Sequence, residues 1–271
     1  MLEAIGLSRT YLPPAGFGLG RHRPAPVHAL RAATLAVAPG RVLGIIGQSG
    51  SGKSTLGRLL VGLEPATSGQ VRIDGQDAGT LLAQDRKAFY RRVQMVFQDP
   101  YGSINPQHDV LETVTRPLRY QGERGGPALR RRAVEVLERV GLRPAERYLQ
   151  THPHRLSGGQ RQRLCIARAI IMEPRYLVAD EPISMLDVSI KWDIIRLLKR
   201  LVHEQGLALV YITHDLATVR TLCHEVAIML AGEIVESGPV DRVLDDPQHA
   251  YTRALIAACP SADLALRGVA K

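Results

Sequence analysis

The chain has 271 residues and carries 35 Lys and Arg against 26 Asp and Glu, which gives a formal net charge of +9. With 45% hydrophobic and 23% charged residues, it can bury a full core in one or two domains. We expect no membrane span, because such a span needs an apolar run of ~20 residues, and we expect no secretory signal. Cys165, Cys223 and Cys259 form no paired motif, so we also expect neither a metal site nor a disulfide framework.

The first 46 residues predict three strands. The first ends near Tyr11, and the second runs from His28 to Val37 before Pro39-Gly40 stops it. Between them the segment LPPAGFGLGRHRPAP is rich in Pro and Gly, which predicts an irregular loop. Residues Val42 to Ile46 form a short apolar run with β-branched members, which is typical of a buried strand.

The sequence GQSGSGKS that follows fits the phosphate-loop pattern Gly-x4-Gly-Lys-Ser/Thr, between a strand and a helix that we expect from Thr55. Its glycines should adopt backbone dihedrals that other residues resist, so that loop amides and the helix N-terminus can bind nucleotide phosphates. Lys53 should reach the β- and γ-phosphates, and Ser54 should ligate Mg²⁺. The alternative is a Gly/Ser-rich turn that only happens to precede a lysine. The predicted phosphate-binding residues are Gly47, Gln48, Ser49, Gly50, Ser51, Gly52, Lys53, Ser54 and Thr55.

The rest of the chain alternates strands with helices. The predicted strands and turns are a turn at Ser68-Gly69, strand Gln70–Ile73, a turn at Asp74-Gly75, and strands Val93–Phe97, Tyr176–Ala179, Leu207–Ile212, Val226–Leu230 and Glu233–Glu236. The predicted helices are 128–140 within a helical insertion over about 101–155, Gln160–Met172, Ile190–Gln205, and a helix-like stretch over 241–260.

This alternation predicts a mostly parallel sheet whose ligand lies beyond the carboxyl ends of its strands. Asp180 and Glu181 follow a buried strand, and His214 follows another. Asp180 could hold Mg²⁺ and Glu181 could polarise a water aimed at the γ-phosphate. The alternatives are a helix-capping acidic pair and a surface histidine. Gln98 by itself indicates little.

The sequence LSGGQ at 156–160, followed by RQR, resembles the signature motif of ATP-binding cassette (ABC) ATPases. The phosphate loop, Gln98, this motif, Asp180-Glu181, the segment SMLD ending at Asp187, and His214 occur in that family's order. The resemblance implies an α/β P-loop NTPase fold with a mostly parallel core sheet, an N-terminal antiparallel β subdomain and a helical subdomain insertion. It implies a single domain with a core over 1–98 and 156–238, a helical subdomain over 99–155 and a C-terminal helical tail over 239–271.

The resemblance also implies a mechanism in which two ATPase modules close around two ATP molecules. Glu181, His214 and Gln98 would be catalytic, and Ser54, Gln98 and Asp180 would hold Mg²⁺. Ser157, Gly158, Gly159 and Gln160 would complete the ATP site of the opposite module, which Asp187 would contact. Tyr11 resembles the aromatic residue that stacks on adenine, although it could equally be an edge-strand residue.

Four segments look like the bacterial importers of di- and oligopeptides, nickel and opines: the Pro/Gly-rich loop between Tyr11 and His28, VFQDPYGSINP, the run from Leu186 to Ile190, and DDPQHAYTRALIAACP. Two positions depart from that pattern, with Met185 where Ala is usual and Ala250 where Pro is usual. Many relatives continue into a cysteine-bearing extension, but only Cys259 lies in this tail, so we expect no iron–sulfur cluster.

We therefore predict an ATP-hydrolysing importer subunit, peripheral to the cytoplasmic face of a bacterial cell membrane. Its expected partners are a second ATPase subunit, two integral-membrane permeases and a periplasmic or extracellular substrate-binding protein, without direct nucleic-acid binding. One alternative is a soluble ABC-type accessory of phosphonate breakdown. The other, an ABC ATPase acting on nucleic acid or the ribosome, is less favoured because the chain has one cassette and no heptad run.

Overall fold

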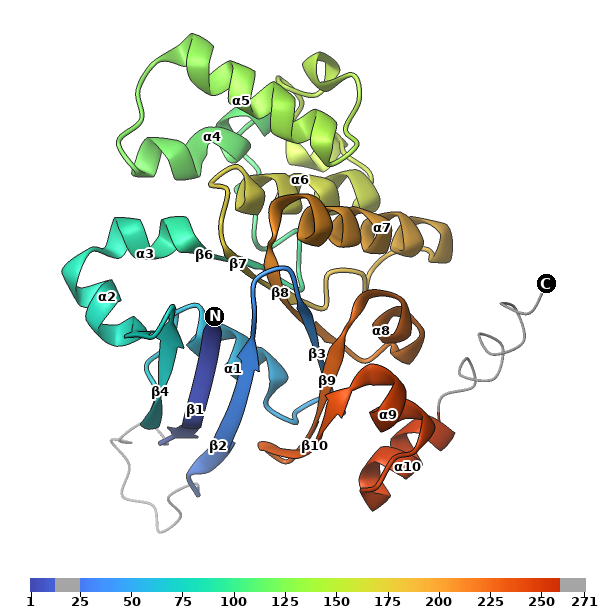
Figure 1. Ribbon diagram of the computed structural model, residues 1–271. Helices are drawn as coiled ribbons and strands as arrows, with labels where there is room; N and C mark the ends of the chain where they lie inside the picture. Colours follow the sequence, from blue (N-terminus) through green and yellow to red (C-terminus); the bar gives the residue numbers. More distant parts are fainter. Residues whose placement is uncertain (13–24, 259–271) are drawn as a thin grey trace, which may run out of the picture.

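The computed structural model describes residues 1–12 and 25–258. Most of the predicted Pro/Gly-rich loop and the end of the tail, including Cys259, lie outside the described residues. The described chain forms two sheets with helix α1 (Lys53–Leu60) between them, and a layer of helices beyond the larger sheet (Figure 1).

The larger sheet has six strands in the order β10-β9-β3-β8-β7-β6, and all neighbours are parallel except β9 and β10. Every residue of β3, β7 and β8 is buried, as expected of strands covered on both faces. The mostly parallel core sheet expected from the sequence is therefore confirmed. Its strands are β3 (Val42–Ile46), β6 (Val93–Val96), β7 (Tyr176–Asp180), β8 (Ala208–Thr213), β9 (Glu225–Leu230) and β10 (Glu233–Pro239).

The smaller sheet is antiparallel, with the order β2-β1-β4-β5, which confirms the expected N-terminal antiparallel unit. The turn predicted at Ser68-Gly69 is wrong, because these residues begin β4. Ser68 pairs with Ser8 and thereby extends the ladder across an irregularity in β1. The strands are β1 (Leu2–Tyr11), β2 (Val27–Val37), β4 (Ser68–Ile73) and β5 (Gln76–Asp77).

Helices cover both faces of the six-stranded sheet. One face packs against α6, α7 and α8 in a single hydrophobic cluster, and the other packs against α1 and the antiparallel sheet. The tail that the sequence predicts as one helix-like stretch is two short helices, with an interruption that includes Pro247. The helices on the first face and in the tail are α6 (Gly158–Ile170), α7 (Val188–Gln205), α8 (Leu216–Leu222), α9 (Val240–Asp245) and α10 (Ala250–Ala257).

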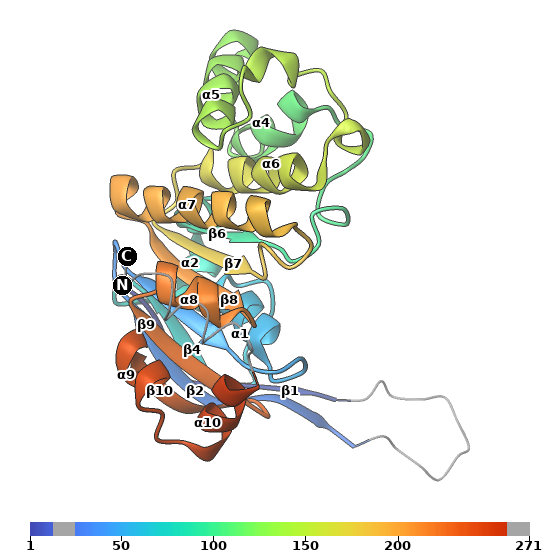
Figure 2. The same ribbon diagram turned by 90° about the vertical axis from the view of Figure 1, so that its right-hand side faces the viewer.

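Helices α4 (Val110–Tyr120) and α5 (Gly126–Arg139) pack on α6 at the end of the molecule farthest from α10 (Figures 1 and 2). Asp109 caps α4 by accepting a hydrogen bond from the amide of Glu112 at 2.7 Å. Two short 3-10 turns, Ala145–Arg147 and Pro153–Arg155, lead from α5 to α6. The predicted helical insertion therefore forms a layer that shares α6 with the core.

Sequence analysis missed three short helices, α2 (Ala78–Gln84), α3 (Arg86–Arg92) and α8. Each follows an aspartate whose carboxylate accepts an amide hydrogen bond from the first turn. Asp77 accepts from Thr80 at 2.7 Å, Asp85 accepts from Ala88 at 2.9 Å, and Asp215 accepts from Ala217 at 3.1 Å. These caps were the available signal. Within 1–12 and 25–258, no helix combines the length and apolar character needed to cross a bilayer.

The strand register aligns the elements that carry the predicted site. Ile46 at the end of β3 pairs with Thr213 of β8, and Ile212 of β8 pairs with Asp180 of β7. Because the three strands are parallel and adjacent, their carboxyl ends meet at one edge of the sheet. The loops after β3, β7 and β8 therefore emerge side by side.

Candidate functional site

The phosphate loop follows β3 and ends at α1, as predicted, although the helix begins two residues earlier than expected, at Lys53. The dihedral explanation holds for Gly50 and Gly52, whose φ values are 80° and 100°. It is wrong for Gly47, which has no positive φ. A Cβ at Gly47 would instead lie 2.3 Å from the carbonyl oxygen of Met229, so this glycine is required by the close passage of β9.

Lys53 lies inside the loop and is only 6% exposed. Its Nζ donates hydrogen bonds to the carbonyl oxygens of Gly47 at 2.8 Å and Gln48 at 2.7 Å. Burial lowers the pKa of Lys53, while the nearby carboxylates of Glu181 and Asp180 act in the opposite direction. The ammonium group is therefore placed next to the loop amides and two acidic side chains, where a phosphate would meet it.

Ser54 and Asp180 form the candidate magnesium pair. The hydroxyl of Ser54 donates to Oδ1 of Asp180 at 3.2 Å, and Asp180 is 4% exposed. Burial raises the pKa of Asp180, and the hydrogen bond from Ser54 opposes that shift. A hydroxyl and a carboxylate oxygen at the end of a phosphate loop suit Mg²⁺, which prefers oxygen ligands and keeps several waters. In the described part of the chain, His, Cys, Asp and Glu form no cluster of three that could hold a metal by themselves.

Glu181 brings three strand ends together. Its Oε2 accepts from Nε2 of Gln98 at 3.0 Å, and its Oε1 lies 3.5 Å from Nδ1 of His214, which is 62% exposed on its side chain. These residues follow β7, β6 and β8 respectively. Of the predicted catalytic residues, Glu181 therefore contacts both Gln98 and His214, beside the phosphate loop.

The backbone at Glu181 is strained. Its φ of 44° is in the left-handed region, and this conformation costs a residue other than glycine about 1–3 kcal/mol. The amide of Glu181 donates to the carbonyl oxygen of Ile212 at 2.9 Å. Such strain persists where surrounding structure enforces it, and it is concentrated at functional positions. No sequence pattern indicated it.

The signature segment begins α6. Ser157 caps this helix, because its Oγ accepts from the Gln160 amide at 3.2 Å while the Ser157 amide donates to Oε1 of Gln160 at 2.9 Å. A Cβ at Gly159 would lie 2.7 Å from Cγ2 of Ile190, so the first turn of α6 packs closely on α7. Asp187, another predicted ATP-site residue, precedes α7 and is exposed.

The signature segment and the phosphate loop belong to opposite sides of the six-stranded sheet. Helix α6 packs on the face that carries α7, whereas α1 packs on the other face (Figure 2). Among the described residues, no hydrogen bond joins Ser157, Gly158 or Asp187 to the phosphate loop. One copy of the chain therefore presents these two groups at separate places.

Tyr11 lies at the end of β1. Its hydroxyl donates to Oε2 of Glu64 at 2.5 Å, and the guanidinium of Arg9 lies over its ring, 4.7 Å from the centroid. Tyr11 pairs with Val27 in β2, the strand in which Ala29 contacts the phosphate loop. Its stacking on adenine stays a prediction.

Sequence analysis also missed Tyr251 of α10, whose side chain contacts the loop. The Gln48 amide donates to its hydroxyl oxygen at 3.1 Å. The two residues are separated by 203 positions, and no local pattern indicates such a contact.

Helix α6 also contacts the segment after Gln98. The guanidinium of Arg161 lies 3.8 Å from the ring centroid of Tyr101, and Sγ of Cys165 lies 3.4 Å from Oγ of Ser103. Arg168 donates to the carbonyl oxygen of Ser103. Because residues 161, 165 and 168 lie on one face of the helix, this face holds the segment that leads to the helical layer.

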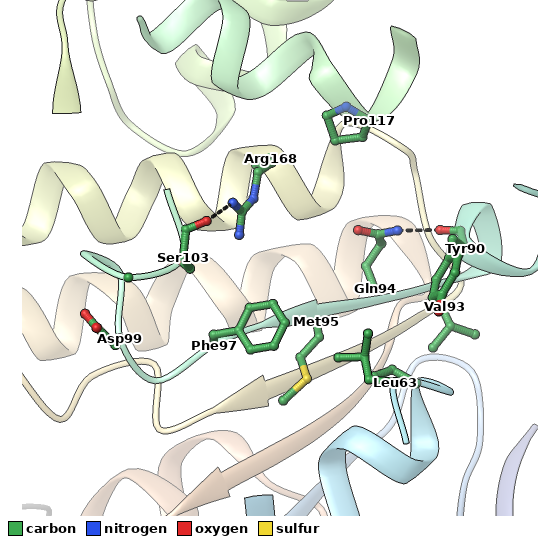
Figure 3. A pocket seen from close by; sticks show the side chains of 12 residues that line it. Leu63, Tyr90, Val93, Gln94, Met95, Phe97, Asp99, Ser103, Pro117 and Arg168 are labelled. Carbon is green, nitrogen blue, oxygen red and sulfur yellow. Dashed lines mark hydrogen bonds between the residues drawn. The ribbon is translucent and has the colours of Figure 1, made fainter. Parts of the chain in front are cut away.

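A cleft of about 600 Å³ opens beside this segment, between α1 and the helical layer (Figure 3). Its lining is mostly apolar and includes the polar side chains of Gln94, Asp99 and Arg168. The side chains drawn in Figure 3 come from the chain after α1, from α3, from β6 and the segment that follows it, from α4 and from α6. They include Leu63, Tyr90, Met95, Phe97, Pro117 and Arg168.

A family model described as "ABC transporter" matches residues 30–184. The chain is 44% identical over 263 residues to the glutathione import ATP-binding protein GsiA of Salmonella typhimurium, a match that covers 97% of this chain and 42% of that protein. It is 43% identical over 250 residues to the protein of the same name from Escherichia coli K12, covering 92% and 40%. The chain thus spans about two fifths of the length of these relatives.

Two solved structures are similar in fold. A dimeric post-hydrolysis state of the ATP-binding cassette MJ0796 bound to ADP and Pi matches with a TM-score of 0.76 and 31% identity, covering 89% of this chain and 99% of that one. The structure of cbiO1 from Clostridium perfringens, described as part of the ABC transporter complex cbiONQ, matches with a TM-score of 0.74 and 26% identity, covering 98% of both chains.

Proposed function

The chain belongs to the ABC transporter family, and from this membership we propose that it is the ATP-hydrolysing subunit of an importer for small peptides. The expected ABC ATPase fold and the resemblance to this family are confirmed by the matching cassettes and the family model. The importer assignment is supported by relatives described as glutathione import ATP-binding proteins. Glutathione is itself a small peptide, so we propose a cargo of that class, with nickel or opines as less supported alternatives.

The observation that carries the ATPase part of this proposal is the meeting of Lys53, Asp180 and Glu181 at the carboxyl edge of the six-stranded sheet. In our proposal Lys53 and the loop amides bind the β- and γ-phosphates of ATP. Ser54 and Asp180, with Gln98, hold Mg²⁺, which supplies charge neutralisation at the phosphates when it is bound. Glu181, oriented by its contacts with Gln98 and His214, accepts a proton from the attacking water.

We propose that the active form is a dimer in which each signature segment completes the ATP site of the opposite copy or of a homologous chain. The separation of Ser157 and Asp187 from the phosphate loop within one chain supports this arrangement, as does the dimeric state of the matching cassette. Met185 and Val188, next to Asp187, are 59% and 71% exposed, although both are apolar. The N-terminus of α6 is capped by the exposed Ser157, and such a helix end suits an anionic γ-phosphate.

We further propose that the cleft in Figure 3 receives a segment of a membrane permease. It is apolar, it adjoins the chain after Gln98, and Arg168 at its edge contacts Ser103. Binding there would be coupled to the ATP site through Gln98 and Glu181. Two permeases, an external substrate-binding protein and a position at the cytoplasmic face of the membrane complete the proposal.

The test is capture of partners by a trapped variant. Glu181→Gln should still bind ATP and should hydrolyse it about 10²–10⁴-fold more slowly, because it loses the positioned base. Tagged and held with ATP, it should bring two permeases out of gently extracted membranes of the source bacterium. Lys53→Ala, which should not bind ATP, is the matched control. Recovery of soluble enzymes or ribosomes without a permease would refute the importer assignment, and parental hydrolysis by Glu181→Gln would refute the role of Glu181.

A further inference from the structure

The phosphate loop is held from outside by segments distant in the sequence. Besides the approach of Met229 to Gly47, the amide of Gly232 donates to the carbonyl oxygen of Ser51 at 3.0 Å. A Cβ at Gly52 would lie 2.3 Å from the carbonyl oxygen of Ala29. These contacts fix the loop against β2 and the β9–β10 turn. They provide no hydrogen bond to the first peptide group of the loop, which is bonded by other side chains.

That first peptide unit, between Gly47 and Gln48, is bonded on both sides. Its carbonyl oxygen accepts from Nζ of Lys53 at 2.8 Å, and its amide donates to the hydroxyl oxygen of Tyr251 at 3.1 Å. In a trans peptide the carbonyl and amide groups point in opposite directions. Lys53 therefore holds the unit from inside the loop and Tyr251 holds it from outside. Hydrogen bonds at the two ends of one peptide group also polarise and strengthen each other.

Tyr251 is itself well fixed. It lies in the first turn of α10, and its ring packs against the main hydrophobic cluster together with Leu255 and Ile256. Glu236 of β10 secures the start of this helix, since its carboxylate accepts from the amides of Gln248 at 2.8 Å and His249 at 3.1 Å. The hydroxyl thus reaches the loop from a helix anchored to the core sheet.

We propose that Tyr251 is a positioning residue of the phosphate loop, through which α10 contributes to nucleotide affinity. Its hydroxyl fixes the Gly47–Gln48 peptide, and that peptide fixes the ammonium group of Lys53. Without the hydroxyl, the Gln48 amide loses its partner and the loop samples conformations that bind phosphates less well. The inference rests on the proposed function, because it requires ATP to bind at this loop.

The test compares Tyr251→Phe with the parent and with Tyr120→Phe. Tyr251→Phe removes one hydroxyl and keeps the ring. Tyr120 is 57% exposed, and within 1–12 and 25–258 its hydroxyl has no hydrogen-bond partner, so Tyr120→Phe is the matched change away from the site. For each purified full-length protein we would measure the Kd of a fluorescent ATP analogue with Mg²⁺, kcat at saturating ATP, the apo Tm, and hydrogen exchange of the peptide that contains Gln48.

We expect Tyr251→Phe to raise the Kd about 2- to 10-fold, which is the contribution of one hydrogen bond. Its kcat should stay within about twofold, because saturating ATP restores the bound loop. Exchange at the Gln48 peptide should accelerate in the apo protein, and Tyr120→Phe should match the parent in every measurement.

Two results would overturn the inference. In the first, Kd is unchanged in Tyr251→Phe whatever happens to exchange, so the contact does not serve binding; if kcat and Tm fall as well, Tyr251 is a purely structural residue. In the second, Kd rises while exchange at the Gln48 peptide is unchanged, so Tyr251 acts by another route. Failure of the parent itself to bind MgATP would instead refute the proposed function.

Discussion

Replacing glycine by alanine should affect the stability of the apo protein differently at the two glycines that begin α6. A Cβ at Gly159 would lie 2.7 Å from Cγ2 of Ile190, a distance that side chains do not tolerate without movement. The neighbouring Gly158 has room, since a Cβ there would meet only Cδ2 of Leu186, at 3.7 Å. We therefore expect Gly159→Ala to destabilise the apo protein relative to Gly158→Ala.

The magnitude follows from two opposing effects. Replacing glycine by alanine in a helix gains roughly 0.5–1 kcal/mol, and both variants share this gain. Gly159→Ala alone adds an overpacked methyl group against a γ-carbon next to the backbone of α7, which costs about 1–3 kcal/mol. The difference between the variants isolates that cost, and at about 2–4 °C per kcal/mol it lowers the Tm of Gly159→Ala by roughly 2–12 °C.

The assay is thermal unfolding of the two apo variants and the parent, followed by circular dichroism in the same buffer. Urea unfolding gives the free-energy difference independently, provided that the m-values agree. Equal midpoints for the two variants would show that α6 does not pack on Ile190 as described. A lower midpoint for Gly158→Ala would refute the reasoning altogether.

Two further outcomes are expected. Ser157→Ala should lower the free energy of unfolding of the apo protein by about 0.5–2 kcal/mol, the usual contribution of a helix cap. The control Ser189→Ala, at an exposed position, should change it little. If urea titrations show no change for Ser157→Ala, the cap is not formed. Burial lowers the pKa of His224, and its Nδ1 accepts from the Val42 amide at 3.0 Å. Since the depressed pKa means that the folded state binds fewer protons, the stability that His224 contributes should be present above its ordinary pKa of 6.5 and be lost as the pH falls below it. His224→Asn should flatten the stability profile between about pH 7 and 5, and a variant profile parallel to that of the parent would contradict this.

Much of the site could be predicted because its signals are local. The strand, loop and helix around Lys53 lie within twenty consecutive residues, Asp180 ends an apolar strand, and His214 directly follows another. The reason for Gly47 could not be predicted, because it depends on the passage of Met229 from the far end of the chain. The same holds for Tyr251, whose contact crosses 203 positions.

The fold divides in a similar way. Long periodic elements such as α5 and α7 were predicted to within two residues at each end, because their apolar spacing is regular. Helices α2 and α3 are only 7 residues each and are mostly exposed, so they carry almost no apolar pattern. The order of the strands in the larger sheet follows from packing across the whole chain, which no single segment encodes.

That strand order has a consequence for biosynthesis. Among the described strands, β3, which carries the phosphate loop, pairs only with β8 and β9, and both lie far downstream of it in the sequence. A ribosome therefore extrudes the nucleotide-binding segment long before either neighbouring strand exists. Until then this apolar strand lacks its native partners, and unpaired apolar strands are prone to aggregate. ATP binding at this loop consequently cannot stabilise the emerging chain before β8 and β9 have been made.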